Sequence, residues 1–319
     1  MTASIDVVVR AVRQEAPDVR SYRLVRPDGA GLPAWTPGAH IDVHLDTGLT
    51  RPYSLCGSPG DCASYLVAVK REPRSGGGSA AMHERVQAGS RLRISPPRNA
   101  FALCAAAARH LLLAGGIGIT PLLAMARALA RDGASFRLHY FTRSPGHAAF
   151  DTVLRTELPP GAYTPHPGLA AEAVEQALRA ILGTRRAGEH LYLCGPRPFM
   201  DAARQIAGPA WPLDAVHLEH FGAAPAPAAA DGAFIVRLAK SGGQYRVANG
   251  ESIVAALARH GIYIDTSCEQ GVCGTCVVDV LEGAPDHRDE VLTDDERRAC
   301  TKIAACVSRS LGPLLVLDL

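Results

Sequence analysis

Residues 268–276 read CEQGVCGTC, and this stretch places three cysteines at the spacing C-x4-C-x2-C. The chain has nine cysteines, and five of them lie in its last sixth, at positions 268, 273, 276, 300 and 306. Since Met1–Glu15 lacks the apolar region of a secretory signal, this clustering indicates a metal site in a reducing compartment rather than disulfides. Gly271 and Gly274 allow the positive-φ backbone that a loop wrapped around a metal group requires.

The cysteine spacing is the ligand pattern of a plant-type [2Fe–2S] cluster, in which a fourth thiolate lies far downstream. Cys268, Cys273 and Cys276 are the first three predicted ligands, and either Cys300 or Cys306 supplies the fourth. A structural zinc site is one alternative, although zinc sites often use two C-x2-C pairs and only Cys273 and Cys276 form such a pair. A disulfide pair or unrelated buried thiols could also account for these cysteines, but the spacing favours the cluster.

The composition is that of a globular protein with more than one domain. At 319 residues the chain is long enough for two or three cored domains, and 47% hydrophobic with 20% charged residues is ordinary. The formal net charge is +2 without a run of Lys and Arg, so we do not expect a nucleic-acid partner. Arg109 and His110 interrupt the apolar stretch 102–119, so we expect no membrane helix. The predicted protein is a cytoplasmic monomer.

A segment rich in Pro and Ala separates the cysteine-rich end from the rest of the chain. Residues 223–231 read AAPAPAAAD, which favours an extended linker and leaves residues 232–319 as a separate [2Fe–2S] domain. Residues 1–103 hold short β-patterned runs between Gly and Pro clusters, which predict an antiparallel β-barrel. Residues 104–222 alternate strand and helix patterns, which predict an α/β doubly wound parallel sheet.

The individual elements follow from the periodicity of the apolar residues. The barrel strands are predicted at Ile5–Ala11, Ser21–Arg26, His40–Leu45, Tyr65–Lys70 and Arg91–Ser95. The parallel strands are predicted at Leu111–Ala114, Phe136–Phe141, Leu191–Cys194 and Val216–Leu218. The helices between and after them are predicted at Pro121–Arg131, Ala148–Glu157, Ala171–Ile181 and Pro198–Ile206.

Two segments of the barrel region carry groups suited to a flavin phosphate. Arg51-Pro52-Tyr53-Ser54 offers a guanidinium for the phosphate, an aromatic ring beside the flavin and a hydroxyl for the isoalloxazine edge. Gly77, Gly78 and Ser79 lie in a glycine-rich loop before a helical stretch at Met82–Gln87, where backbone N–H groups can bind an anion. Alone, either segment also fits an ordinary strand or a flexible loop, but together they favour a flavin site.

Two strand-to-helix turns in the α/β region carry glycines suited to a dinucleotide. The first turn contains Gly116, Gly118 and Thr120, with Pro121 at a predicted first helical position. The second turn places Gly195-Pro196 directly after Cys194, which predicts a thiol exposed at the carboxyl edge of the sheet, where ligands bind. A plain strand–turn–helix would also explain the first turn, and a buried small residue at a strand end would also explain Cys194.

The end of the second parallel strand bears on the choice between NADH and NADPH. An acidic ribose ligand is expected at this position, but the chain has Arg143 and Ser144 there. These residues also suit a 2′-phosphate. The residues alone therefore leave NADPH possible.

Five signals occur in the order found in one family. Arg51–Ser54 resembles the R-x-Y-S motif, and Cys194–Met200 resembles the C-G-P-x-x-M motif, of the ferredoxin-NADP⁺ reductase superfamily. With the first glycine turn, the linker and the cysteine spacing, they resemble the phthalate dioxygenase reductase family over essentially the whole chain. That family includes vanillate demethylase reductases and the reductase modules fused to some cytochromes P450. The resemblance implies a multi-domain fold that ends in an α+β β-grasp ferredoxin domain.

The resemblance also implies the cofactors and the fourth cluster ligand. FMN is expected rather than FAD because no adenosine-binding feature follows the flavin domain, and NADH is expected as the electron donor. Cys306 is the implied fourth ligand, because residues 306–309 are similar to the end of the ferredoxin module in oxygenase reductases. Cys300 is then a buried small residue.

The remaining site residues come from the same resemblance. Ser54 and Cys194 are expected on either side of the nicotinamide ring as the catalytic positions, with Cys194 orienting the ring rather than acting as a nucleophile. Asn99 lies in the segment that closes the flavin domain of the family. Phe221 lies in the segment that passes near the flavin, where it either packs on a ring or serves as an ordinary hydrophobic anchor.

The predicted function is electron transfer from NADH through FMN and a [2Fe–2S] cluster to an oxygenase partner. A Rieske aromatic oxygenase or O-demethylase is favoured, and the sequence has no Rieske or haem segment of its own, so oxygen activation is expected in another protein. A reductase for a cytochrome P450 and a stand-alone flavin or ferric reductase are the enzymatic alternatives. An iron–sulfur sensor or a zinc adaptor is the non-enzyme alternative.

Overall fold

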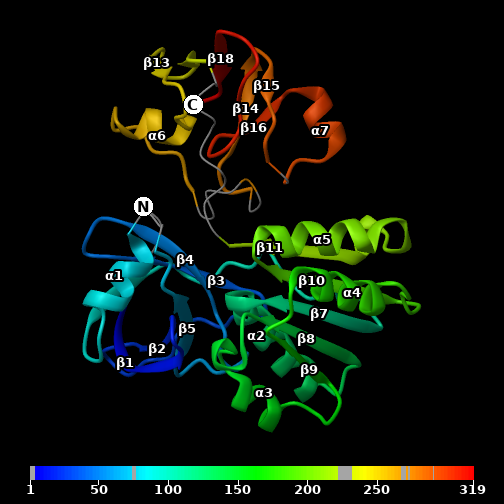
Figure 1. Ribbon diagram of the computed structural model, residues 1–319. Helices are drawn as coiled ribbons and strands as arrows, with labels where there is room; N and C mark the ends of the chain where they lie inside the picture. Colours follow the sequence, from blue (N-terminus) through cyan, green and yellow to red (C-terminus); the bar gives the residue numbers. More distant parts are fainter. Residues whose placement is uncertain (1–3, 74–76, 222–231, 267–270, 272–273, 290) are drawn as a thin grey trace. The chain divides into compact units, whose positions relative to one another are not determined.

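The computed structural model describes residues 4–73, 77–221, 232–266, 271, 274–289 and 291–319 (Figure 1). The chain folds into two compact units, Met1–Phe221 and Gly222–Leu319. Within the described ranges, no helix combines the length and the apolar composition that a membrane span requires. The linker predicted at 223–231 lies outside the described residues, and the boundaries of the three predicted domains stay a prediction.

The first sheet is an antiparallel barrel with the strand order β4-β3-β6-β1-β2-β5. Its elements are β1 (Ile5–Ala16), β2 (Val19–Val25), β3 (His40–His44), β4 (Thr50–Ser54), β5 (Tyr65–Lys70), α1 (Gly78–Arg85) and β6 (Arg91–Ile94). Successive side chains of a strand point to opposite faces, so Val7, Val9, Tyr22 and Leu24 are buried inside. An isolated bridge between Leu55 and Val67 joins the two edges of the sheet and closes it. The predicted barrel is confirmed.

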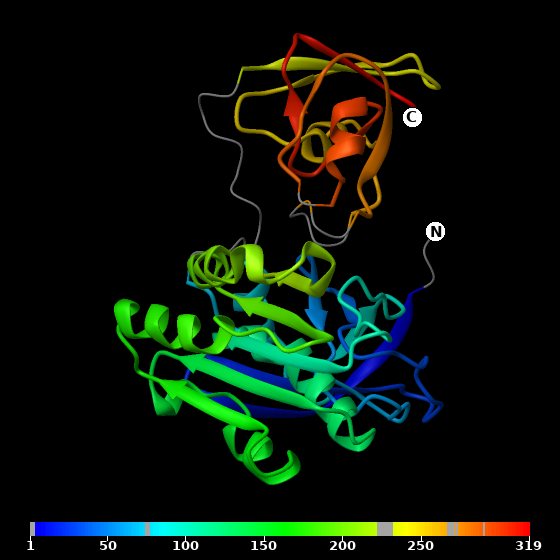
Figure 2. The same ribbon diagram turned by 90° about the vertical axis from the view of Figure 1, so that its right-hand side faces the viewer.

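The second sheet is parallel throughout and has the order β11-β10-β7-β8-β9. Its strands are β7 (Arg109–Gly115), β8 (Phe136–Thr142), β9 (Tyr163–Pro167), β10 (Glu189–Gly195) and β11 (Val216–His220), and its helices are α2 (Ile119–Arg131), α3 (Asp151–Glu157), α4 (Ala171–Leu182) and α5 (Arg197–Ala207). Leu112 packs with α2 and α3, whereas Leu111 and Leu113 pack with α4 and α5. Helices therefore cover both faces, as predicted for a doubly wound sheet (Figure 2).

Several boundaries differ from the predicted ones for local reasons. The sequence pattern did not predict β9, whose sequence YTPHP contains two prolines, and β9 is an edge strand, where a missing N–H costs no ladder bond. Helix α3 begins at Asp151 rather than Ala148, because Phe150 adopts a left-handed φ of 62°. Helix α2 begins at Ile119, directly after a 3₁₀ turn at Gly116–Gly118, so Pro121 is its third residue rather than its first.

The second unit is an α+β fold around a mixed five-stranded sheet of order β13-β12-β18-β14-β16. Its elements are β12 (Phe234–Leu238), β13 (Gln244–Val247), α6 (Ile253–Ala258), β14 (Val277–Glu282), β15 (Pro285–Asp286), α7 (Asp294–Ala299), β16 (Lys302–Ala304), β17 (Arg309–Ser310) and β18 (Leu314–Leu317). Ile253 and Leu257 of α6 pack on the sheet in one buried cluster. This architecture agrees with the expected β-grasp fold.

One buried arginine ties separate segments of the second unit together. Arg309 is only 2% exposed and donates hydrogen bonds to the carbonyl oxygens of Gly232, at 2.9 Å, and Ala248, at 3.1 Å. Its guanidinium lies 5.0 Å from the ring centroid of Phe234, a cation–π distance. A buried guanidinium needs such partners, because an unpaired buried charge is costly.

Candidate functional site

The first unit brings Ser54 of the barrel next to the carboxyl end of the parallel sheet. The hydroxyl of Ser54 donates a hydrogen bond to Oε2 of Glu219 at 3.3 Å. Glu219 on β11 is the register partner of Cys194 on β10. The two predicted catalytic positions, Ser54 and Cys194, are therefore gathered around one carboxyl group at the edge where α/β sheets bind ligands.

Ser54, Cys194 and Glu219 form a trio of neighbouring side chains, and their surroundings keep the Cys194 thiol and the Glu219 carboxyl neutral. Loss of solvation raises the pKa of the Glu219 carboxyl to about 8, although its hydrogen bond from Ser54 acts in the opposite direction. Burial raises the pKa of the Cys194 thiol well above its ordinary value, and the neighbouring Glu219 adds to the effect. Cys194 is thus no thiolate nucleophile, which agrees with the orienting role expected for it.

The exposure predicted for Cys194 is wrong. Cys194 is 0% exposed, because the turn before α2 packs directly on it. A Cβ atom added to Gly118 would lie 2.1 Å from the carbonyl oxygen of Cys194. The sequence pattern predicted the strand end but not this close packing of two turns.

Glu219 was not among the predicted site residues. The sequence interpretation of the same segment selected Phe221, which is 36% exposed at the end of the first unit. A signal for Glu219 was present in the sequence, since it is an acidic residue near the end of the last parallel strand. Side chains at such ends meet at one edge of the sheet.

The predicted phosphate-binding residues of the barrel also come together. Helix α1 begins at Gly78, after Gly77 with a φ of 87°, rather than at the predicted Met82. A Cβ atom on Gly78 would lie 2.6 Å from Cγ of Arg51, so the Arg51 side chain lies directly against the start of the helix. A guanidinium beside the free N–H groups of a helix start is a suitable anion site. These residues fit a flavin phosphate.

The other flavin-side predictions have different surroundings. Tyr53 is half-buried against the barrel core. Ser79 accepts a hydrogen bond from the backbone N–H of Glu72 at 3.1 Å. The amide of Asn99 donates to Oγ1 of Thr36 at 2.7 Å and accepts from Phe101 N at 2.9 Å, so it braces a loop within the protein. A cofactor contact of Asn99 stays a prediction.

The two glycine turns at the end of the parallel sheet interlock. A Cβ on Gly115 would lie 2.9 Å from Cδ of Pro196, and a Cβ on Gly195 would lie 3.0 Å from Cα of Gly115. Gly116 has a φ of 53° and a Cβ there would meet no described atom within 4 Å, so the backbone is open on that side. Thr120 is buried and donates to Ile117 O at 3.1 Å. An open glycine backbone before α2 fits a pyrophosphate.

The residues at the end of β8 are partnered within the protein. Arg143, which is 71% exposed, lies 3.6 Å from a carboxylate oxygen of Asp18. Oγ of Ser144 lies 2.7 Å from Nδ1 of His147. An ion pair this exposed leaves Arg143 able to bind a 2′-phosphate, so its contact with Asp18 does not separate NADH from NADPH.

In the second unit the structure brings two of the predicted cluster ligands together. The sulfur atoms of Cys276 and Cys306 lie 3.1 Å apart, both residues are buried, and neither forms a disulfide. Cys268 and Cys273 lie outside the described residues. The thiol of Cys300 instead donates to the carbonyl oxygen of Arg297 at 3.3 Å.

This arrangement fits a cluster site that uses Cys306. Two unbonded buried thiols at this distance match two thiolates directed at one metal group. Gly271 and Gly274 on the same loop have φ values of 75° and 76°, the backbone that the sequence analysis expected there. The thiol of Cys300 is instead hydrogen-bonded to the carbonyl oxygen of Arg297 at the end of α7, rather than to another cysteine.

Comparisons with family models match two parts of the chain. Residues 236–311 match the 2Fe-2S iron-sulfur cluster binding domain, and residues 90–211 match the N-terminal domain of the DmmA-like subunit of dimethylamine monooxygenase. The first match covers the cysteine-rich segment, and the second covers most of the parallel sheet.

Whole-length relatives give a more specific comparison. The chain is 44% identical to a vanillate O-demethylase oxidoreductase of Pseudomonas putida and 42% identical to one of Pseudomonas sp. (strain HR199 / DSM 7063), in both cases over 99% of this chain and 100% of the relative. A phthalate dioxygenase reductase structure, described as a modular structure for electron transfer from pyridine nucleotides to [2Fe-2S], matches with a TM-score of 0.79 and 36% identity. That match covers 99% of this chain and 98% of the other.

Proposed function

The chain belongs to the phthalate dioxygenase reductase family, and we propose that it passes electrons from NADH through FMN and a [2Fe–2S] cluster to a separate oxygenase. The observation that carries this proposal is the full-length identity of 42–44% to vanillate O-demethylase oxidoreductases. The close approach of the Cys276 and Cys306 sulfur atoms supports the [2Fe–2S] cluster as the last electron carrier. When bound, the flavin accepts a hydride and releases single electrons, which is the exchange that a one-electron cluster requires.

The residues of the first unit supply binding and orientation. Arg51 and the start of α1 would hold the flavin phosphate, and the open backbone at Gly116 would receive the pyrophosphate of NADH. Ser54 and Cys194 position the reacting rings, and Glu219 holds the Ser54 hydroxyl in place. Because its pKa is raised to about 8, Glu219 is mostly neutral at pH 7 and would add little negative charge to a site that binds a hydride acceptor.

Cys268, Cys273, Cys276 and Cys306 hold the cluster. The buried position of Cys276 and Cys306 excludes water from two of the four thiolates. Exclusion of water and hydrogen bonds to sulfur are the means by which a protein sets the potential of a cluster. Cys300 takes no part in ligation.

For the partner, we propose a Rieske-type O-demethylase of methoxylated aromatic acids. Two full-length relatives above 40% identity carry the name vanillate O-demethylase oxidoreductase. A self-sufficient cytochrome P450 structure also matches, at 36% identity and a TM-score of 0.81, but this chain covers 41% of it. The match to the separate reductase over the full length of both chains favours a two-component system. The cytoplasmic location and the monomeric state stay predictions.

An anaerobic titration with NADH tests the electron path. Flavin and iron are first quantified in the purified protein, and NADH is then added in steps under ultraviolet–visible and EPR spectroscopy. We expect flavin bleaching and a rhombic [2Fe–2S] signal on reduction. Bleaching without that signal would contradict the role of the cluster.

A turnover assay tests the partner separately. The reduced protein is combined with the oxygenase component of a vanillate O-demethylase, vanillate and oxygen, and formaldehyde is measured. Formaldehyde formation that depends on both proteins supports the proposal. Normal cluster reduction without formaldehyde, together with turnover of a P450, would move the partner to the other class while the electron path stands.

A quinone is a second candidate acceptor. One relative, 39% identical over 99% of this chain, is named tetrachlorobenzoquinone reductase. Direct reduction of a quinone at the flavin does not need the cluster. Quinone reductase activity that survives removal of a cluster ligand would favour this candidate.

A further inference from the structure

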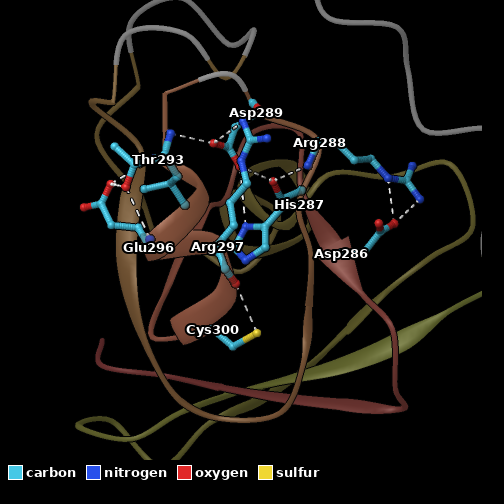
Figure 3. A network of polar contacts seen from close by, with 10 residues as sticks. Asp286, His287, Arg288, Asp289, Thr293, Glu296, Arg297 and Cys300 are labelled. Atoms are coloured by element: carbon cyan, nitrogen blue, oxygen red, sulfur yellow. Dashed lines mark hydrogen bonds and ion pairs between the residues drawn. The ribbon is translucent and has the colours of Figure 1, made fainter.

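A buried carboxylate lies at the centre of a polar network in the second unit. The side chain of Asp289 is 0% exposed. It accepts hydrogen bonds from Leu292 N at 2.9 Å and from the hydroxyl of Ser308 at 3.2 Å. Figure 3 shows Asp289 between His287 and Arg297, which approach from the same loop and from α7. None of these residues belongs to the sites described above.

The segment that carries Asp289 packs on the cysteine loop at two glycines. A Cβ atom on Gly271 would lie 2.9 Å from Cα and 3.0 Å from Cβ of Asp289. The backbone N–H of Val291 donates to the carbonyl oxygen of Gly271 at 3.1 Å, and a Cβ on Gly274 would lie 3.2 Å from Cγ2 of Val291. Gly271 lies between Cys268 and Cys273, and Gly274 lies between Cys273 and Cys276. The segment therefore supports the loop on both sides of Cys273.

The same carboxylate reaches the segment of the fourth cysteine. Ser308 is fully buried two residues after Cys306. Its hydroxyl donates to Oδ1 of Asp289 and accepts from the backbone N–H of Arg288 at 3.1 Å. Asp289 thus connects the loop of the first three cysteines to the segment of the fourth.

The network contains charges as well as hydrogen bonds. Nδ1 of His287 lies 3.6 Å from Oδ1 of Asp289, and Nη2 of Arg297 lies 3.9 Å from Oδ2. Arg297 also donates a hydrogen bond to the backbone carbonyl of Asp289. The side chain of His287 is 10% exposed, and neither of its ring nitrogens has a hydrogen-bond partner among the described residues. Burying a carboxylate costs desolvation free energy, and an apolar side chain at the same position would not have this cost.

We propose that Asp289 is a positioning residue for the [2Fe–2S] cluster, which holds the cysteine loop and the Cys306 segment in one geometry and contributes its negative charge to the cluster potential. The proposal rests on the proposed function only in taking the four cysteines as cluster ligands. Groups that support the ligands of a metal in this way orient those ligands and tune the metal. A carboxylate has enough acceptor sites to bond Leu292 N and Ser308 together, whereas an amide oxygen has fewer.

Three variants separate position from charge. Asp289→Asn keeps the shape of the side chain but removes the charge and part of the acceptor capacity. Ser308→Ala removes one hydrogen bond to Asp289 without a change in charge. Asp279→Asn is the matched control, because Asp279 is an exposed carboxylate on β14 only three residues after Cys276. Each is purified as the full-length holoprotein.

Four readouts are compared with the wild-type protein: the EPR g values of the reduced cluster, its midpoint potential, the rate of iron release to a chelator, and NADH–ferricyanide reduction at the flavin. We expect Asp289→Asn to change the g values, to raise the potential more than Asp279→Asn does, and to release iron about tenfold faster. Ser308→Ala should change the g values and speed iron release, with a smaller change in potential. Ferricyanide reduction should stay at the wild-type rate in every variant.

The proposal is overturned if both Asp289→Asn and Ser308→Ala keep the wild-type g values, potential and iron-release rate. If Asp289→Asn does not retain iron, Ser308→Ala decides by the same measurements. A potential that rises equally in Asp289→Asn and Asp279→Asn, with unchanged g values, also overturns it, because that result reflects charge alone. A wild-type protein without a cluster signal would refute the proposed function instead.

Discussion

The two units position their functional groups by different means. In the first unit, Ser54, Cys194 and Glu219 stand at the ends of three strands, so sheet hydrogen bonds fix where they lie. In the second unit, Cys276 precedes β14 and Cys306 follows β16, so both lie in loops. Their geometry depends on glycine backbone and on buried polar groups. We therefore expect the first site to be sensitive to backbone crowding and charge burial, and the second to the loss of single polar contacts.

The largest expected effect comes from removing a cluster ligand in the second unit. Cys306→Ser should abolish the [2Fe–2S] EPR signal and lower NADH-driven cytochrome c reduction by at least about tenfold, while NADH–ferricyanide reduction continues at the flavin. The reason is that a plant-type cluster needs four thiolates. Iron content and both rates are measured on the same preparation.

Cys300→Ser is the matched control for this experiment. Its thiol bonds to Arg297 rather than approaching Cys276, so the variant should keep iron and electron transfer. Loss of the cluster in Cys300→Ser with retention in Cys306→Ser would exchange the two assignments. It would also place the fourth ligand at the end of α7.

The next effect concerns the half-buried carboxyl of Glu219 in the first unit. The pKa of Glu219 rises from 4.5 to about 8 on folding, so between these pH values the unfolded chain has released a proton that the folded chain retains. Stability should therefore fall as pH rises from 4.5 to 8, by on the order of 3 kcal/mol because partial exposure weakens the full effect. Glu219→Gln, which keeps an acceptor for Ser54, should remove this pH dependence.

Urea unfolding followed by tryptophan fluorescence measures this effect in the first unit. The chain has two tryptophans, and both Trp35 and Trp211 are buried in that unit. Equal pH slopes in the wild-type protein and Glu219→Gln would contradict the prediction. Glu296 of the second unit shows the opposite sign: Lys302 and Thr293 lower its pKa to about 2, so its own small contribution to stability is lost only as pH falls from 4.5 towards 2.

The contrast between the units also explains what the sequence could predict. The barrel, the parallel sheet and the cysteine spacing depend on local periodicity and on motifs, and the structure bears out both sheets. The sequence indicated that Glu219 lies near an edge of the sheet, but not that it contacts Ser54, which is 165 positions away. Asp289 likewise meets its partner Ser308 across 19 positions. No local pattern encodes such contacts.

The errors at Cys194 and β9 have the same origin. Burial of Cys194 results from packing between two turns that are far apart in the chain. The two prolines of β9 argue against a strand when the segment is considered alone. The strand forms because the segment lies at the edge of the sheet, where proline is tolerated. Tertiary context overrides local propensity at both positions.

A smaller effect tests the backbone crowding expected in the first unit. In Gly118→Ala the new Cβ would lie 2.1 Å from the carbonyl oxygen of Cys194, and backbone cannot move aside as a flexible side chain does. We expect the free energy of unfolding of this unit to fall by about 2 kcal/mol, with weaker NADH binding. Tryptophan-monitored urea unfolding and NADH titration measure the two changes.

Gly31→Ala is the control for this substitution. Its new Cβ would meet only ordinary contacts, 3.7 Å from Cys62 O at the nearest, and its backbone needs no positive φ. Stability should stay within about 0.5 kcal/mol of the wild-type value. If Gly118→Ala lost no more stability than Gly31→Ala, the backbone at Gly118 would have moved to make room for the methyl group at little cost.

The smallest effect tests how far the second unit depends on single polar contacts. Thr293 caps α7: its hydroxyl accepts from Glu296 N, and the Glu296 side chain accepts from Thr293 N. None of the residues of α7 is buried, whereas α6, capped by Ser252, buries Ile253, Ala256 and Leu257. Thr293→Ala should lower the free energy of unfolding by about 1 kcal/mol, and Ser252→Ala should lower it by a similar amount.

The two cap variants should nevertheless differ at the cluster. Fraying of α7 releases Arg297 from the backbone carbonyl of Asp289, while α6 is held by its buried face. Followed by the visible absorbance of the cluster on heating, Thr293→Ala should lower the midpoint by about 4–8 °C. It should also release iron faster at 25 °C, which Ser252→Ala should not do. Equal iron release in the two variants would show that α7 supports the fold of the second unit without supporting the Asp289 network.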